Sequence, residues 1–430
     1  MEFLTFMGRN ARWLSGGFLL CFFSSFGQTF YISLSNGDIR REFDLSNGDF
    51  GLLYMAATLA SAATLPTLGW TLDRFKAWQV AAVTVLCLAL ATAVMSLAAS
   101  LPLLVLSLYM LRLFGQGMMT ETAMTATGRW FAANRGRAMA LISLGFHVGT
   151  GLFPLIFVAV AASLGWRGTW LACGAVLVVI ALPTLAWTTA KDRDPQSEPK
   201  MRERPAVRDW TMREVVASPT FWLVASAVLA PPFIGTTLFF HQVYLTELRG
   251  WPIEVFASGF AVMSATTVVF ALLCGSLVDR FSAVRLLPFF LIPMSLACFV
   301  VWLFSAEVTI FVFMVFLGIS NGFSSTLLGA LWPELYGTKH LGSVRSVTVA
   351  LMVLASALGP GVTGVLIDRQ VDYPLQIGVM GLYCVAISLV MAVVAMRQRK
   401  VESAHAASAS VAGALAERGI DRVDPQPHER

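Results

Sequence analysis

Residues 69–75 read GWTLDRF, and residues 275–281 read GSLVDRF. Four positions are identical at an offset of 206 residues, namely the Gly, Asp, Arg and Phe of each stretch. The same offset places Pro154 on Pro360, in segments of similar apolar character. A short stretch alone could match by chance, but a further match at the same offset makes chance a poor explanation. We therefore predict that the chain consists of two repeated halves.

The composition is that of a membrane protein. Hydrophobic residues make up 57% of the 430 residues and charged residues only 13%, against about 25% charged residues in globular proteins. A soluble protein with so few polar residues could not cover its surface. A disordered chain would be rich in charge and poor in aromatic residues. Long unbroken apolar runs also differ from the alternating pattern of a membrane β-barrel.

Apolar runs of about 20 residues predict membrane-spanning helices. Twelve such runs lie near 13–35, 50–70, 78–98, 102–126, 138–161, 168–190, 219–243, 255–278, 284–304, 307–330, 346–367 and 374–396. We predict an all-α membrane protein with twelve transmembrane helices in two pseudo-symmetric six-helix halves, residues 1–190 and 219–400. A charged linker (191–218) joins them, and the polar tail (401–430) is expected to be disordered.

The basic residues predict the orientation in the membrane. Of the 30 Lys and Arg residues, 24 lie in the termini and loops on one side, five lie on the other, and Arg112 lies inside a span. The positive-inside rule then places both termini in the cytoplasm, in a bacterial inner (plasma) membrane. The same rule accounts for the net charge of +5, so nucleic acid is not an expected partner. No cleavage site of a signal peptide follows the first residues.

The sequence lacks the usual motifs of metal-binding and nucleotide-binding proteins. The six cysteines fall inside apolar runs without the spacing of metal ligands. No GxxxxGK[ST] or HExxH motif occurs. We therefore expect a protein that is not an enzyme and that binds no metal and no cofactor.

Three motifs resemble those of a known transporter family. Residues 69–76 (GWTLDRFK) resemble the signature loop of the major facilitator superfamily, and Arg112 with residues 115–117 (GQG) resembles its fourth-helix Arg motif. Gly145, Gly149 and Pro154 partly match its fifth-helix motif. Residues 128–140 (GRWFAANRGRAMA) are similar to the monocarboxylate and oxalate/formate branch. The resemblance implies two halves that rock around one site near the membrane midplane, in a protein that acts as a monomer.

Arg112 is the strongest single candidate for a functional residue. It lies about eleven residues into the fourth span, where a charge costs at least about 2.5–3.5 kcal/mol, so it should face an internal cavity. It could bind a substrate carboxylate through its fork of donors, or it could organise a proton-coupling network. Alternatively, it braces the half by binding backbone carbonyls.

Other polar residues of the spans are candidates of lesser strength. Ser24, Gln28, Tyr31 and Ser35 are spaced by four, three and four residues, which predicts one helix face turned toward a neighbouring helix or the pore. Glu121 is either a protonation site or a partner of Arg129, Arg135 or Arg137. His147 suits proton coupling, because histidine titrates near neutral pH. The residues predicted to bind substrate or couple protons are Gln28, Tyr31, Arg112, Gln116, His147, His241 and Asn321.

A second set of residues is expected to serve the conformational change. Asp73 would latch the halves, as the resemblance implies, and Arg74 would add a charge pair. Pro231 and Pro232 break the seventh span, while Pro154 and Pro360 supply bending points in the two halves. The predicted gating residues are Asp73, Arg74, Glu121, Pro154, Asp279, Arg280 and Pro360.

The sequence as a whole predicts a secondary transporter that works by alternating access. The expected substrate is a small organic anion such as a monocarboxylate, moved with protons across the lipid bilayer. Two alternatives stay open. One is proton-driven export of amphipathic or drug-like compounds, and the other is a receptor or sensor that keeps the fold without transporting.

Overall fold

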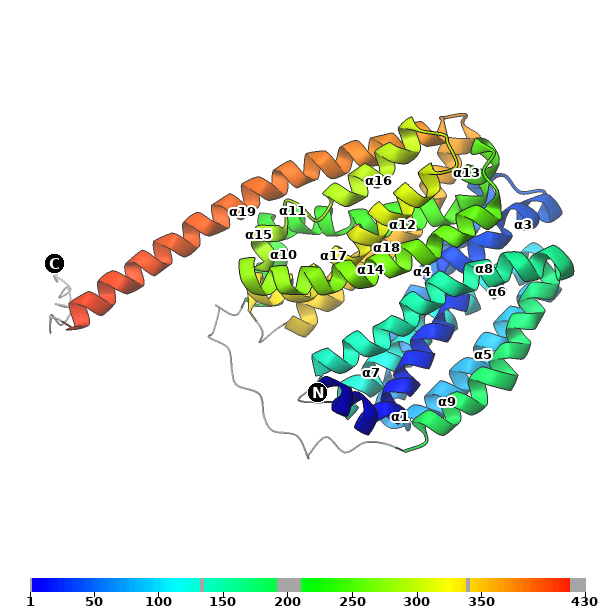
Figure 1. The fold of residues 1–430 in the computed structure, drawn as a ribbon, viewed down its shortest axis with the longest axis horizontal. Helices are drawn as coiled ribbons and strands as arrows, with labels where there is room; N and C mark the ends of the chain where they lie inside the picture. The colour runs from blue at the N-terminus through cyan, green and yellow to red at the C-terminus, as the bar shows by residue number, and fades with distance from the viewer. Residues whose placement is uncertain (1, 132–134, 192–209, 338–340, 418–430) are drawn as a thin grey trace, which may run out of the picture.

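The computed structural model describes residues 2–131, 135–191, 210–337 and 341–417. Within these ranges every regular element is a helix, and the helices form two bundles that lie against each other (Figure 1). The first bundle, here called the N-half, contains α1 (Glu2–Phe23), η1 (Ser24–Gly27), α2 (Thr29–Ile32), η2 (Ser33–Ser35), α3 (Asn36–Phe43), α4 (Asn47–Arg74), α5 (Ala77–Leu97), α6 (Leu101–Met110), η3 (Leu111–Met119), α7 (Thr120–Trp130), α8 (Arg135–Val176), η4 (Leu177–Ala181) and α9 (Leu182–Thr189).

The second bundle is called the C-half. It contains α10 (Met212–Ala217), α11 (Pro219–Val228), α12 (Ala230–Phe240), α13 (Gln242–Arg249), α14 (Ile253–Phe281), α15 (Ala283–Leu286), α16 (Ile292–Leu303), α17 (Thr309–Tyr336), α18 (Leu341–Asp368) and α19 (Tyr373–Glu417). Helix α19 runs on to Glu417, into the stretch for which disorder is expected from the sequence. Its alanine-rich sequence has a high helix propensity. Residues 418–430 lie outside the described part of the chain.

The helices of the described residues are consistent with the twelve predicted spans. Nine helices of the described ranges are long and apolar enough to cross a membrane. One of these, Gly136–Thr189, contains both the fifth and the sixth span, because Gly165 interrupts it with φ 67° and ψ 173°. The first span is a pair of helices, Thr5–Gly27 and Thr29–Phe43, bent by 45°, and the ninth is the shorter helix Ile292–Leu303. The prediction of an all-α membrane protein is confirmed, and the helices are consistent with two halves of six spans each.

Large apolar side chains cover the outside of the bundle. Val179, Leu272 and Leu389 are 71%, 70% and 66% exposed, respectively. Such side chains would be costly to expose to water, whereas hydrocarbon tails solvate them without cost. The surface therefore matches a lipid bilayer along the sides of the molecule.

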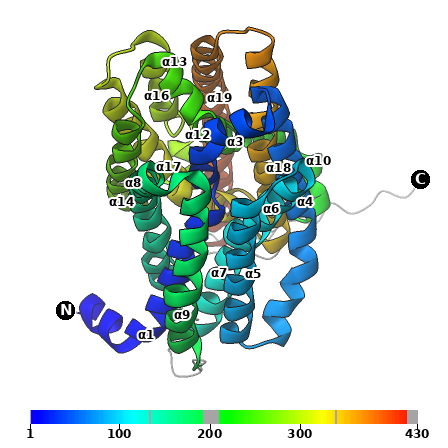
Figure 2. The same ribbon diagram turned by 90° about the vertical axis from the view of Figure 1, so that its right-hand side faces the viewer.

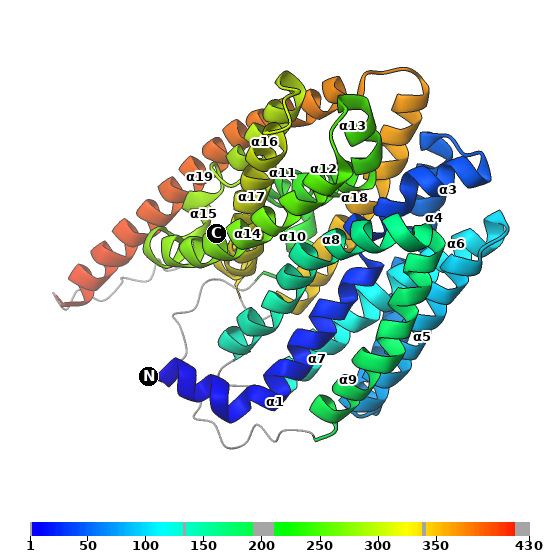
Figure 3. The same cartoon turned by 45° about the vertical axis from the view of Figure 1, so that its right-hand side comes forward.

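The two halves meet at one end of the molecule. This end carries α3 and α13. The other end carries the N-terminus and the α4–α5, α7–α8 and α14–α15 junctions. We call the end with the N-terminus the basic end, and the end with α3 and α13 the opposite end. Helix α4 packs against α18, and α8 packs against α14 (Figure 2). The halves diverge from there toward the basic end (Figure 3).

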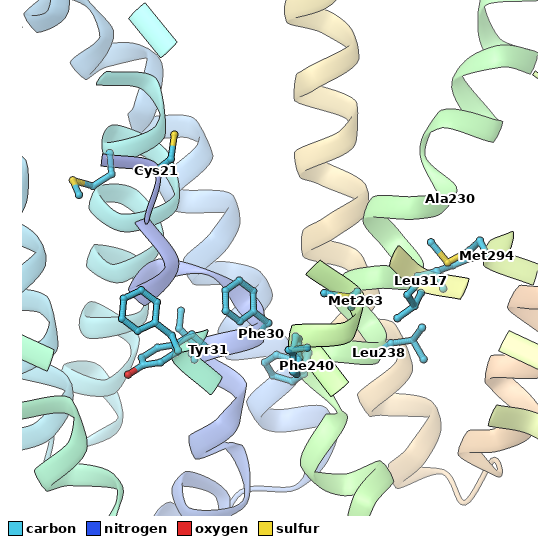
Figure 4. Close-up of a cluster of buried hydrophobic side chains, with 14 of the residues drawn as sticks. Cys21, Phe30, Tyr31, Ala230, Leu238, Phe240, Met263, Met294 and Leu317 are labelled. Atoms are coloured by element: carbon cyan, nitrogen blue, oxygen red, sulfur yellow. The ribbon is translucent and has the colours of Figure 1, made fainter. Parts of the chain in front are cut away.

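Apolar and polar contacts both join the halves at the opposite end. The Phe50 and Phe240 rings stack with centroids 5.2 Å apart. Phe30 of the N-half and Phe240 of the C-half point toward this boundary, while Tyr31 points away from it (Figure 4). Gln242 Nε2 donates to the carbonyl oxygen of Phe30 at 2.8 Å. These contacts join the two halves at this end.

Candidate functional site

The first span is broken near its middle. Residues Ser24–Gly27 form a 3₁₀ turn, and Gln28 has the extended backbone angles φ −85° and ψ 151° before α2 begins. A broken helix leaves backbone groups without their usual partners, and in a membrane such groups need a cavity or another ligand. The break therefore places the Gly27 carbonyl, which accepts a hydrogen bond from the fourth span, inside the N-half.

A π-helix, η3, faces this break and carries Arg112. Such wide turns are rare and often occur at functional sites. The two segments approach so closely that a Cβ at Gly27 would lie 2.6 Å from Gly115 Cα and 2.7 Å from Gln116 N, and against the carbonyl oxygen of Leu111. Only glycine permits this contact, which brings the Arg112 guanidinium over the broken backbone.

Arg112 is buried, with only 4% of its surface exposed. Its Nη1 donates to the Gly27 carbonyl at 3.4 Å and to Thr29 Oγ1 at 3.3 Å, and both bonds are long. The guanidinium carbon lies 5.5 Å from the centre of the Tyr54 ring. The Tyr54 hydroxyl in turn lies 2.8 Å from Thr29 Oγ1. Neutral groups thus surround this cation.

Arg112 has no acidic partner in the part of the chain that the structure describes. Among the described residues, no carboxylate lies within 4 Å of its guanidinium, and its Nε–H has no hydrogen-bond partner. A buried charge is normally paired, because desolvation otherwise costs several kcal/mol. An arginine held by two long bonds, with a free donor, can still form strong charge-assisted bonds to a carboxylate or sulfonate. The arrangement is therefore suited to bind an anion.

The close approach at Gly27 leads to a stability prediction. Gly27→Ala should lower the free energy of unfolding by about 1–3 kcal/mol, because its Cβ would force η3 away from the first span. Gly235→Ala is the matched control, since no atom lies within 4 Å of a Cβ built there. Thermal denaturation of the purified protein in detergent measures both. Equal melting temperatures for the two variants would contradict the prediction.

A cavity of about 400 Å³ lies in the C-half, between the seventh, tenth and eleventh spans. Its lining is mostly apolar, with a few polar groups and one basic residue, as is common for ligand pockets. The residues that line it are Val228, Pro231, Pro232, Asn321, Ser324, Ser325, Leu328, Gly329, Trp332, Arg345, Thr348, Val349 and Met352.

Comparison with known proteins identifies the family. The model of the Major Facilitator Superfamily matches residues 17–360 and 259–420, which is most of the chain. The chain belongs to the major facilitator superfamily. It is therefore a membrane transporter by family and not an enzyme.

Individual members of the superfamily are similar to this chain. The probable sulfoacetate transporter SauU of Cupriavidus necator is 24% identical over 404 residues, which cover 87% of this chain and 91% of that protein. The crystal structure of a bacterial homolog of the human lysosomal transporter Spinster, in an inward-facing and unoccupied conformation, has a TM-score of 0.64 at 19% identity. It covers 90% of this chain and 95% of its own. The inward-facing and occupied structure has the same TM-score at 18% identity, over 89% and 94% of the two chains.

Further predicted residues of this superfamily member lie along the first span. The prediction of one continuous face for Ser24, Gln28, Tyr31 and Ser35 is wrong, because the helix is broken at Gln28. Tyr31 is buried, and its hydroxyl lies 2.9 Å from Cys173 Sγ. Trp170 Nε1 donates to Ser35 Oγ at 2.9 Å. These side chains therefore face neighbouring helices of the N-half.

The polar neighbours of Arg112 along the fourth span differ in their surroundings. The Gln116 side-chain oxygen is buried without a hydrogen-bond partner. Tyr109 donates to Thr64 Oγ1 at 3.0 Å. Glu121 is exposed and forms no ion pair with another described residue. Arg135, one of its expected partners, has a side chain outside the described part of the structure.

The two candidate histidines occupy unlike positions. His147 is half-buried on α8, edge-on to the Phe146 ring at 5.6 Å. His241 is fully buried at the α12–α13 junction, and its Nε2 lies 3.2 Å from the Pro360 carbonyl oxygen. Its Nδ1 has no partner among the described residues. Asn321, by contrast, lines the C-half cavity.

The predicted gating residues lie mainly at the ends of helices. Arg74 and Arg280 are exposed at the basic end, over the rings of Trp70 and Phe281. The side chains of Asp73 and Asp279 are outside the described part of the structure. Pro154 is buried inside α8, and Pro360 is buried inside α18 with its carbonyl against Gly51 of the N-half.

A contact between the halves that the sequence did not indicate involves Asp368. Its carboxylate accepts hydrogen bonds from Ser46 Oγ at 2.6 Å, from Asn47 N at 3.1 Å and from Gly48 N at 2.8 Å. Asp368 ends the eleventh span in the C-half, whereas its donors begin α4 in the N-half. A carboxylate at a helix N-terminus is favoured by the helix dipole. This contact, here called the Asp368 clasp, holds the halves together at the opposite end.

Proposed function

We propose that this superfamily member is a secondary transporter that moves a small organic anion by alternating access, with Arg112 binding the acidic group. The buried, unpaired guanidinium of Arg112 carries this proposal, because an anion supplies the charge that the described residues do not. The long bonds to Gly27 and Thr29 can be exchanged for shorter bonds to a carboxylate or sulfonate.

The similarity to the probable sulfoacetate transporter supports the substrate class. Sulfoacetate carries a sulfonate and a carboxylate, and a guanidinium fork matches either group. A monocarboxylate presents the same chemistry with a single acidic group. We accordingly propose small carboxylates and sulfonated carboxylates as substrates, moved together with protons.

The orientation and the conformational state are also part of the proposal. We place the basic end in the cytoplasm of a bacterial cell and the protein in its inner membrane, as a monomer. The halves touch at the opposite end and diverge toward the basic end, so this conformation would be open to the cytoplasm. A return to the outward-open state would require the Asp368 clasp to separate.

Uptake into proteoliposomes tests the proposed function. We expect the purified wild-type protein to take up labelled sulfoacetate or a small carboxylate. When the outside is more acidic, a pH dye inside the liposomes should report acidification of the interior. Liposomes without protein are the control, because small carboxylic acids cross lipid in their neutral form, whereas a sulfonate does not. Movement of lipophilic cations without any anion would overturn the proposal in favour of export of amphipathic compounds.

A further inference from the structure

His241 lies on the boundary between the two halves, at the opposite end of the molecule. Helix α12 ends just before it, and α13 begins just after it. Its two neighbours in the chain both bind the N-half. Asn36 Nδ2 donates to the Phe240 carbonyl at 2.8 Å, and Gln242 Nε2 donates to the Phe30 carbonyl at 2.8 Å. His241 is therefore held within the contact that keeps this end closed.

The imidazole and the N-half contact the same carbonyl group. His241 Nε2 lies 3.2 Å from the Pro360 oxygen. A Cβ built on Gly51 of α4 would lie 2.5 Å from that oxygen, so the N-half packs directly on it. The imidazole has no exposed surface in this conformation. Separation of α4 from α18 would remove this cover and let water reach the carbonyl and the ring beside it.

The hydrogen bond to Pro360 determines where a proton could be added. A carbonyl oxygen only accepts, so Nε2 carries a hydrogen, and Nδ1 of the neutral ring then carries a lone pair. Nδ1 has no partner among the described residues. A proton added there would create a buried cation with an N–H group that donates to nothing, at a cost of several kcal/mol. The closed end therefore favours the neutral imidazole.

The charges around His241 do not compensate a second proton on the ring. Arg40 and Asp368 act on it electrostatically with opposite signs, and neither forms an ion pair with it in the described part of the chain. Histidine is the only residue type of this set that ordinarily titrates near neutral pH. The charged and titratable groups of the surrounding elements are Arg40 of α3, Tyr54 of α4, Tyr244 and Glu247 of α13, Asp368 of α18 and Tyr373 of α19.

We propose that His241 is a proton-binding site that controls the opening of the transporter to the outside. The ring is neutral while the opposite end is closed, and it takes up an external proton at Nδ1 when the halves separate there. Because the proton binds only to the open state, acid outside shifts the equilibrium toward that state. The inference rests on the alternating access and orientation of the proposed function, but not on the substrate or on Arg112.

Distances between spin labels on the full-length protein test this proposal. Exposed Ala99 of the N-half and Ala306 of the C-half, changed to cysteine in a Cys87→Ser background, are the label positions. A wetted imidazole with the ordinary pKa of about 6.5, protonated only in the open state, predicts a pH effect of about tenfold. The ratio of long to short distances should rise by that factor from about pH 7.5 to about pH 5.5.

His241→Gln should reduce this pH effect to less than about twofold, because glutamine can donate to the Pro360 carbonyl but cannot take up a proton. Thermal denaturation checks that the variant is folded, and the wild-type pH profile tests the proposal even if it is not. His147→Gln is the matched control, since this half-buried histidine lies on α8, and it should retain the full effect. Asp368→Asn should raise the ratio at both pH values and keep its pH dependence, which separates His241 from the Asp368 clasp.

Two results would overturn the role of His241. One is a wild-type distance distribution that does not depend on pH, and the other is a folded His241→Gln protein that keeps the tenfold effect. In both cases alternating access would stand, provided that Asp368→Asn still increases the population of long distances. If neither acid nor Asp368→Asn produced long distances, the proposed function would fail together with this inference.

Discussion

Arg112→Gln is expected to reduce the initial rate of anion uptake into proteoliposomes by at least about 100-fold, which corresponds to the loss of about 3 kcal/mol of binding. Glutamine retains hydrogen-bonding groups and most of the side-chain volume. It lacks the positive charge that would compensate the substrate anion in a buried site. The bonds to Gly27 and Thr29 are long, so their loss alone should cost the fold little.

Two further variants distinguish the effect of the positive charge of Arg112 from that of its planar guanidinium. Arg112→Lys keeps the charge but loses the planar fork, so it should retain a measurable rate below that of the wild type. Arg41→Gln is the control, because Arg41 forms an exposed ion pair with Asp38, and such pairs contribute little. An Arg112→Gln protein that is folded and transports anions within a factor of about two of the wild type would show that Arg112 is a structural brace.

Asp368→Asn is expected to shift the conformational equilibrium toward the state in which the halves separate at the opposite end. The substitution keeps the shape of the side chain but removes the charge that the Asp368 clasp places on the start of α4. Loss of charge-assisted bonds at this partly exposed site should cost about 1–2 kcal/mol, which is a shift of roughly 5- to 30-fold in the equilibrium.

Distances between spin labels at the opposite end measure this shift. Exposed Ala99 of the N-half and Ala306 of the C-half, changed to cysteine, are suitable label positions in a Cys87→Ser background. Asp372→Asn is the matched control, because this carboxylate caps α19 within its own half. We expect a larger population of long distances in Asp368→Asn alone. An unchanged distance distribution would mean that the apolar contacts around Phe240 suffice to hold the halves together.

The sequence predicted the fold well because the relevant signals are local. Each span is an apolar run of membrane length, and the duplicated GWTLDRF and GSLVDRF stretches mark equivalent ends of α4 and α14. The position of Arg112 inside a span was equally visible, since one charge in an apolar run needs no partner to be noticed. The break at Gln28 has no mark in the local sequence, so the spacing of the polar residues in the first span predicts one continuous helix.

Most of the surroundings of the candidate sites depend on contacts between distant residues. Tyr54 and Thr29 reach Arg112 from two other spans, and nothing in their local sequence marks them. Asp368 and Ser46 are 322 residues apart in the chain. A single sequence shows which residues are unusual, but not which of them meet.

Gly318 follows Arg112 by the repeat offset of 206 residues and packs so closely that a Cβ there would lie 2.5 Å from the Met263 carbonyl oxygen. The C-half therefore has no room for an arginine at the position equivalent to Arg112, and the duplicated chain is asymmetric there. A site with true twofold symmetry would present the same groups to both ends of a bound molecule. Here the N-half presents a buried cation, and the equivalent backbone of the C-half presents only helix packing. We therefore expect a substrate with one acidic end to bind in a single orientation, with that end toward the N-half.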